Sequence, residues 1–157
     1  AKTLGCEHIV INSGAKSEGF VRKEFPGFLN QAFIHYGNFI GETLKVASEL
    51  AIKELTLGVM IGKAVKLAEG NLDTHSKNVT MNKPFLADIA KLAGYSFETI
   101  KAIENITLAR QLWDIIPENE AGFFSSIISK CYDVCSPLIP NGKLTVMLIS
   151  EEGEIFR

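Results

Sequence analysis

Short apolar runs rich in β-branched residues alternate with helical patterns through the first half of this chain. Three such runs are centred on Ile9, Ile34 and Leu57. They lie about 24 residues apart, close to the repeat of a strand, a crossing helix and the next strand. Strands connected in this way are parallel neighbours in one sheet, with right-handed crossovers. This spacing limits the fold more than any other feature and predicts a parallel α/β sheet.

Helical patterns follow these runs and dominate the second half. The clearest begins at Asn38, a good N-cap, with Glu42 in its first turn, where the helix dipole favours an acid. Another begins at Gly62 and ends at Gly70, and Thr107 is the expected cap of a later one. The expected helices are 19–25, 38–51, 62–69, 84–93, 96–104, 107–116 and 118–135, and a last strand is expected at 144–149. Residues 1–157 are therefore predicted to form a single α/β domain with an open, mostly parallel, Rossmann-like sheet of about four or five strands, helices on both faces and a helix-rich second half.

Charge and hydropathy exclude several classes of protein. The 157 residues carry a formal net charge of −2 and no long run of like charges, which argues against a basic face that binds nucleic acid. No apolar run approaches the roughly 20 residues that a membrane-spanning helix needs. Residues 1–6 lack the residue order of a signal peptide, and a start without methionine suggests a piece of a longer protein. We therefore expect a cytoplasmic domain without a nucleic-acid or membrane partner.

The cysteines admit two interpretations. Cys6, Cys131 and Cys135 are an odd number, which fits a reducing compartment. Cys131 and Cys135 are four residues apart on a predicted helix, a spacing that can hold two metal ligands. No histidine or third cysteine lies near them in the sequence. Because free cysteine usually behaves as a small apolar residue, we interpret the pair as part of the core and predict no metal site.

Three segments that contain glycine follow the three strands. They are 13–19, 36–42 and 61–63. In a parallel sheet such loops meet at the carboxyl ends of the strands, where ligands bind. Glycine lets backbone amides approach a ligand, and the start of a helix offers unpaired N–H groups. Each loop alone is better explained as an ordinary tight turn, so only their convergence indicates a site.

Two common nucleotide-binding fingerprints are absent. The dinucleotide pattern needs three glycines at fixed offsets and an acid after the second strand, whereas Gly14 and Gly19 are five residues apart and Tyr36 stands near the position of the acid. The phosphate-loop pattern needs Ser or Thr after Gly-Lys, but Ala64 follows Lys63. Neither class of nucleotide site is supported.

An acid, two hydroxyls and an imidazole follow one another at residues 73–76. The imidazole of His75 is a candidate to hold or move a proton, since the reference pKa of histidine as a residue type lies near neutrality. The alternative is a capped turn in which Asp73, Thr74 and Ser76 bond their own backbone. The residues alone leave the two interpretations equal. His8 and His35 lie within predicted strands and are interpreted as structural.

Three blocks of this sequence resemble a known family. The blocks are Asn38-Phe39-Ile40-Gly41-Glu42-Thr43-Leu44, then Ile61-Gly62-Lys63 with Val65-Lys66-Leu67-Ala68 and Gly70, then Thr74-His75-Ser76. Their order and spacing are similar to the central motifs of the cobalt-precorrin-5B C-1 methyltransferases, the CbiD family. Members of that family are longer and have another domain before this one. The resemblance implies that the chain is the C-terminal part of a two-domain protein.

The resemblance also implies an activity. Family members transfer a methyl group from S-adenosylmethionine to ring carbon 1 of cobalt-precorrin-5B, giving cobalt-precorrin-6A in anaerobic cobalamin biosynthesis. Cobalt would enter only as part of the corrinoid substrate, and the partners would be that substrate and the N-terminal domain of the same protein. A homo-oligomer is compatible with this picture. The alternative is a non-catalytic corrinoid-binding or scaffolding domain of a fused cobalamin-biosynthesis protein.

The family motifs select the candidate site residues. Those expected to bind the cofactor through loop amides and short polar groups are Gly14, Ser17, Asn38, Gly41, Glu42, Gly62 and Lys63. Those expected to orient the substrate or accept a proton are Thr74, His75 and Ser76, with His75 as the acid/base candidate. The sequence departs from the family where Met60 replaces a usual histidine and where Thr80, Asn82 and Pro84 replace an acid, an arginine and another acid. These departures are the reason for keeping the non-catalytic alternative.

Overall fold

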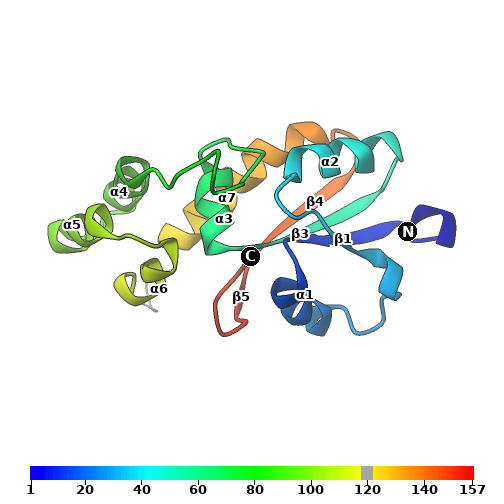
Figure 1. Cartoon of the computed structure of the whole chain (residues 1–157), viewed down its shortest axis with the longest axis horizontal. Coiled ribbons are helices and arrows are strands. Elements are labelled where there is room, and N and C mark those ends of the chain that lie inside the picture. Colours follow the sequence, from blue (N-terminus) through cyan, green and yellow to red (C-terminus); the bar gives the residue numbers. More distant parts are fainter. Residues whose placement is uncertain (118–121) are drawn as a thin grey trace.

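The computed structural model describes residues 1–117 and 122–157 and confirms the α/β class (Figure 1). Among these residues the sheet has five strands in the order β2-β1-β3-β4-β5. Their bounds are β1 His8–Asn12, β2 Phe33–His35, β3 Glu54–Met60, β4 Lys143–Ile149 and β5 Ile155–Phe156. The pairings from β2 through β4 are parallel, and β5 is antiparallel to β4. The sheet is therefore open and mostly parallel, as predicted.

Helices connect the parallel strands and fill the second half of the chain. The α-helices are α1 Ala15–Val21, α2 Ile40–Glu49, α3 Ile61–Ala68, α4 Lys83–Leu92, α5 Phe97–Asn105, α6 Leu112–Ile115 and α7 Gly122–Cys135. The short 3₁₀ helices are η1 Lys2–Leu4, η2 Arg22–Glu24, η3 Asn30–Ala32, η4 Ala109–Gln111 and η5 Ser136–Leu138. No helix among the described residues is both long and apolar enough to cross a membrane.

The two faces of the sheet are covered unequally. On one face lie α2, α3 and α7, and on the other lies α1 (Figure 1). Successive side chains of a strand point to opposite faces, so Ile9 and Ile11 enter the large core under α2, α3 and α7, whereas Val10 enters the other. That second core is small, because besides Val10 it contains mainly Val21 of α1, Phe33 and Ile149. The expected covering of both faces is therefore confirmed, with most of the apolar burial on one of them.

Aromatic side chains complete the smaller face. The ring of His8 lies edge-on to Phe25 and Phe28, with centroid distances of 5.5 and 5.0 Å. Its Nε2 is 2.9 Å from Oγ1 of the buried Thr56. On the neighbouring strand, Nε2 of His35 lies 2.5 Å from a Glu18 carboxylate oxygen. Both histidines thus make structural contacts within this layer, as predicted.

Helices α4, α5 and α6 form a group at one end of the molecule (Figure 1). Leu86, Ile103 and Leu112, one from each helix, are fully buried and extend the large core. Cys131 and Cys135 of α7 are also fully buried, which confirms that they belong to the core. The Cys131 thiol donates to the Ala64 carbonyl of α3 at 3.3 Å. No group of three or more possible metal ligands occurs within the described part of the chain.

Two helix predictions were wrong at their N-termini. The first helix begins at Ala15 rather than at residue 19, because the Gly14 amide donates to Asn12 Oδ1 and to Ser17 Oγ at 3.2 Å each and so closes the turn early. The predicted helix 107–116 is reduced to η4 and α6. Thr107 is not the N-cap, because its amide donates to the Gln111 side chain at 2.8 Å. The 3₁₀ helix η4 therefore starts only at Ala109.

Other boundaries shifted less. The start of the predicted helix 118–135 falls on residues outside the described ones, and α7 is described from Gly122. Helix α2 begins at Ile40, so Asn38 precedes the helix and is not its cap. Strand β5 was not predicted, because a two-residue strand carries no periodic signal. Its position depends on the turn after β4, in which the Ser150 amide donates to the Glu154 carbonyl at 2.9 Å.

Candidate functional site

The carboxyl ends of β1, β2 and β3 meet at one edge of the sheet. Asn12, the last residue of β1, is paired with His35 on one side and with Gly58 on the other. The segments that follow these strands therefore start side by side, which agrees with the predicted convergence of the three glycine-containing loops. This edge is where an open parallel sheet offers room for a ligand.

Lys63 of α3 joins two of these segments. Its ammonium group donates to the Gly37 carbonyl and, at 2.6 Å, to Asn38 Oδ1. It also lies 5.7 Å from the centroid of the Tyr36 ring. Burial lowers the pKa of Lys63, the neighbouring Lys66 lowers it further, and Asp73 partly opposes both effects. A lysine ammonium has three donors, so two filled donors leave one for another oxygen.

The segment 72–74 is held against the start of α2. The Gly41 amide donates to the Leu72 carbonyl at 3.3 Å, and the Thr74 amide donates to the Asn38 carbonyl at 3.1 Å. A Cβ atom on Gly41 would lie only 2.9 Å from Cβ of Leu72. Glycine is therefore required at position 41 by packing, and its amide is already bonded. Its predicted role in cofactor binding stays a prediction, now with a structural role beside it.

Thr74 is the most buried of the three predicted catalytic residues. It is 3% exposed, and its carbonyl accepts from Lys66 Nζ at 3.3 Å. Its Oγ1 is buried and has no hydrogen-bond partner among the described residues. Because a buried hydroxyl without a partner costs free energy, such an atom is a candidate for binding a ligand. Thr74 thus lies in the same cluster as Asn38, Lys63 and Lys66.

His75 and Ser76 are nearer the surface, in the turn that follows. The His75 amide donates to Asp73 Oδ1 at 3.0 Å, and Asp73 Oδ2 accepts from the Asn78 side chain at 2.9 Å. These bonds lower the pKa of Asp73. Nδ1 of His75 is 3.1 Å from the Lys77 amide, which can only donate. The capped-turn interpretation thus describes the geometry of Asp73 and His75, while Ser76 is exposed.

The remaining predicted residues lie further from this cluster. Ser17 is buried in α1 and donates to the Gly14 carbonyl at 2.9 Å. Glu42 is exposed on α2 and pairs with Lys45 at 2.9 Å. A Cβ atom at Gly14 or Gly62 would meet nothing within 4 Å. These two glycines therefore border open space, where a ligand can approach the backbone.

Sequence reasoning missed Asn12 and Tyr36. Asn12 is fully buried, its Oδ1 accepts from the Gly14 amide at 3.2 Å, and its Nδ2 has no partner among the described residues. The Tyr36 hydroxyl donates to the Gly58 carbonyl at 3.4 Å, and burial raises the pKa of Tyr36 well above its usual range, which a hydrogen bond with Ser13 partly offsets. A polar residue that closes a buried β-branched run was the available signal for Asn12.

Comparisons with known proteins identify the family to which the chain belongs. A family model described as the CbiD C-terminal domain matches residues 73–157. A cobalt-precorrin-5B C(1)-methyltransferase of Prosthecochloris aestuarii is 34% identical over 152 residues, which cover 96% of this chain and 41% of that protein. Proteins with the same name from a Geobacillus species and from Thermus thermophilus are 38% and 32% identical, and the matches cover 83% and 79% of this chain but 36% and 34% of those proteins. The chain thus spans less than half the length of these relatives. No solved structure matches it.

Proposed function

Because this chain belongs to the CbiD family, whose C-terminal domain it carries, we propose that it is the C-terminal part of an S-adenosylmethionine-dependent methyltransferase. Its substrate is cobalt-precorrin-5B, which is methylated at ring carbon 1 to give cobalt-precorrin-6A in the anaerobic, cytoplasmic synthesis of cobalamin. The relatives named above all carry the corresponding methyltransferase name. The whole reaction is proposed for the longer protein, and this chain supplies one wall of its cleft.

The observation that carries the proposal is the cluster at the sheet edge. Lys63 lies there on Asn38, and Lys66 on the carbonyl of the buried Thr74, whose hydroxyl has no partner within residues 1–117 and 122–157. A corrin precursor carries many carboxylates, and a carboxylate bonded to a lysine ammonium forms a strong, charge-assisted hydrogen bond. The third N–H of Lys63 and the Thr74 hydroxyl are suited to bind one such carboxylate.

The methyl donor fits the neighbouring part of the same edge. S-adenosylmethionine, when bound, supplies an electrophilic methyl group. The chain's contribution is to hold and orient the two ligands and to exclude water. Gly14 and Gly62 border open space, and the Asn12 side-chain amide has a donor that no described residue fills. Gly62 and Asn12 would bind polar atoms of the methyl donor, whereas Gly14, whose amide is bonded to Asn12 and Ser17, would leave room for it.

His75 acts in this proposal by orienting the substrate. Because its Nδ1 accepts from the Lys77 amide, the neutral ring carries its proton on Nε2 and donates from that atom. To accept a proton lost from the corrin ring carbon, Nδ1 of His75 would first have to break its hydrogen bond with the Lys77 amide. Orientation therefore fits the observed bonding better than the acceptor role expected from the sequence.

The non-catalytic alternative is favoured by one observation, the methionine at position 60. Met60 stands at the N-cap of α3 beside the sheet edge, and it can neither donate a hydrogen bond nor carry a proton. Corrinoid binding without product formation by the full-length protein would favour this alternative. Product formation would exclude it.

The test is a substitution of Lys63 in the full-length protein, with Lys91 as the matched control. Lys63→Met should raise the Kd for cobalt-precorrin-5B at least tenfold, since one charge-assisted hydrogen bond contributes about 1.5–3 kcal/mol. Lys91 is exposed on α4, so Lys91→Met should leave the Kd unchanged. The Kd is measured from the visible absorbance of the corrinoid during titration. Equal Kd values for both variants and the wild type would contradict the proposed site.

A further inference from the structure

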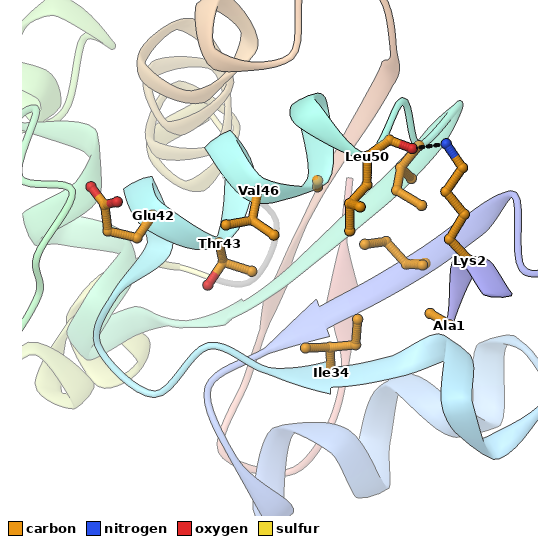
Figure 2. Close-up of a pocket in the computed structure, with 10 residues that line it drawn as sticks. Ala1, Lys2, Ile34, Glu42, Thr43, Val46 and Leu50 are labelled. Carbon is orange, nitrogen blue, oxygen red and sulfur yellow. Dashed lines mark hydrogen bonds between the residues drawn. The ribbon is translucent and has the colours of Figure 1, made fainter.

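An apolar groove, whose lining includes neither Lys63 nor Thr74, lies at the β2 edge of the sheet (Figure 2). Its volume is about 350 Å³. It lies between α2 and the strands β1 and β2, and aliphatic side chains form most of its lining. Ile34 lies on the strand side, and Val46 and Leu50 lie on the helix side (Figure 2). Ile9 of β1 also lines the groove. The polar residues among its lining are Lys2, Glu42 and Thr43.

Helix α2 carries a second apolar stripe along this groove. Its inner stripe, Ile40, Leu44 and Ala47, is buried in the large core. The outer stripe runs through Phe39, Thr43, Val46 and Leu50, at the helical spacing of three and four residues. Phe39, Val46 and Leu50 are 59%, 51% and 49% exposed. An apolar stripe of this length on the surface is typical of a contact with another protein surface.

Three observations indicate what covers this stripe. The relatives are more than twice as long as the matched segment, and the matching family model is that of their C-terminal domain. Ala1 and Lys2 line the groove themselves, and Lys2 Nζ donates to the Leu50 carbonyl (Figure 2). In a protein of the relatives' length, the residues before Ala1 therefore enter the structure at the groove. The remainder of such a protein would lie within immediate reach of it.

We propose that the groove and the outer stripe of α2 are the docking surface for the N-terminal part of the full-length protein. This rests on the proposed function in one respect, that the chain works as the C-terminal part of a longer protein. A stable contact between domains buries roughly 1,000 Å² or more, so it has to extend beyond the groove along the outer stripe to Phe39, which is 59% exposed. The surface that docks is apolar at its centre and polar where it meets Lys2 and Glu42 at the rim.

The docking also explains how the N-terminal part is positioned relative to the sheet edge that carries Lys63 and Thr74. Helix α2 has the groove along its outer side, and its first turn holds the segment 72–74 through the bond between Gly41 and Leu72. A domain that binds α2 is thus fixed relative to Thr74 by one short rigid element. The two walls of the cleft then share a common support.

The test measures the accessibility of position 46 with and without the N-terminal part. Val46→Cys is introduced, on a Cys6→Ser background, into both the 157-residue chain and the full-length protein. Position 46 is half exposed in the chain alone, so its thiol should react rapidly with a maleimide there and at least tenfold more slowly in full-length protein. Leu92→Cys is the control, since Leu92 is 85% exposed on α4 and should react equally fast in both. Mass spectrometry of peptides assigns each modification to its residue.

The outcomes separate the possible occupants. Equal rates for position 46 in the two proteins would overturn the proposal. Protection that appears in the 157-residue chain as its concentration rises, together with dimers in sedimentation velocity, would show that a second copy covers the groove and would also overturn it. Because labelling needs neither methyl donor nor corrinoid, a full-length protein without methyl transfer can still show the protection, and one with methyl transfer can still lack it.

Discussion

Replacement of Gly41 by alanine tests whether α2 positions the segment that carries Thr74. In most helices this change is favourable, because alanine has the higher helix propensity by up to about 1 kcal/mol. At position 41 the added Cβ would lie 2.9 Å from Cβ and 3.2 Å from Cδ1 of Leu72. Carbon atoms prefer separations of about 3.5–4.0 Å. Leu72 therefore has to move by about 0.5–1 Å, and its segment moves with it.

The expected net effect is a loss of stability. Overpacking of this kind costs about 1–3 kcal/mol, and displacement of the Leu72 carbonyl weakens its bond to the Gly41 amide, which contributes about 1 kcal/mol. After subtraction of the gain in propensity, Gly41→Ala should lower the free energy of unfolding by about 2 kcal/mol. For a domain of this size such a change lowers Tm by about 4–8 °C.

The assay is urea unfolding followed by circular dichroism, with Gly19→Ala as the matched control. Gly19 lies inside α1, and a Cβ atom there would meet nothing within 4 Å. This control should therefore raise the free energy of unfolding, by up to about 1 kcal/mol. NMR spectra of Gly41→Ala should show shifted amides for Thr74 and His75. If both variants are stabilised and these amides do not move, Leu72 yields freely and the argument from packing is refuted.

The other two predictions concern cysteine reactivity and pH. An aromatic disulfide reagent should modify Cys6 alone in the native chain and all three cysteines in denaturant, because Cys131 and Cys135 are buried and burial raises the pKa of Cys135 to about 12. Rapid reaction of all three cysteines in the native chain would contradict the packing of α3 against α7. Burial lowers the pKa of His8 below its ordinary 6.5, so His8 binds a proton more readily in the unfolded chain. The contribution of His8 to the free energy of unfolding should therefore be fully present above pH 6.5 and be lost as the pH falls below it. Thermal unfolding between about pH 5 and pH 7 should show this slope in wild type and a flatter one in His8→Gln, and equal slopes would exclude His8 as its source.

The sequence predicted the sheet well because its signals are local and strong. The centres of β1, β3 and β4 are runs of fully or nearly fully buried aliphatic side chains, among them Ile11, Leu57 and Leu148. Gly70, with a φ of 105°, follows the end of α3 as expected. At these positions the sequence allows few alternative structures, because a continuous apolar run must be buried and a positive φ favours glycine.

The errors arose where polar side chains compete with the backbone. The early start of α1 depends on Asn12 and the late start of η4 depends on Gln111, each of which binds amides that would otherwise set the helix boundary. Residue types alone do not decide such competitions, because several partners lie within reach of each side chain. The same limit applies to Lys63, whose contact with Asn38 joins residues 25 positions apart.

The site could be predicted in its location but not in its contacts. Parallel strands bring three loops together, so the sheet edge followed from the strand spacing. The pairing of Gly41 with Leu72 did not, because it depends on how the chain after α3 folds back over α2. The sequence also could not show which of the two apolar stripes of α2 is buried in the core. Leu44 and Val46 are similar side chains, yet one is fully buried and the other is half exposed.

The unequal covering of the sheet sets the order in which parts of the molecule open. Resistance to local unfolding grows with the apolar area that a segment buries. The layer formed by α1 depends on a core of a few side chains around Val10 and Val21, whereas α3 and α7 share the large one. Amide hydrogens of α1 should therefore exchange with solvent through openings that leave the rest of the sheet intact. Asn12 and Gly14 directly precede α1. The side of the proposed cleft that they form can therefore open locally, while the side held by the bond between Lys63 and Asn38 remains folded.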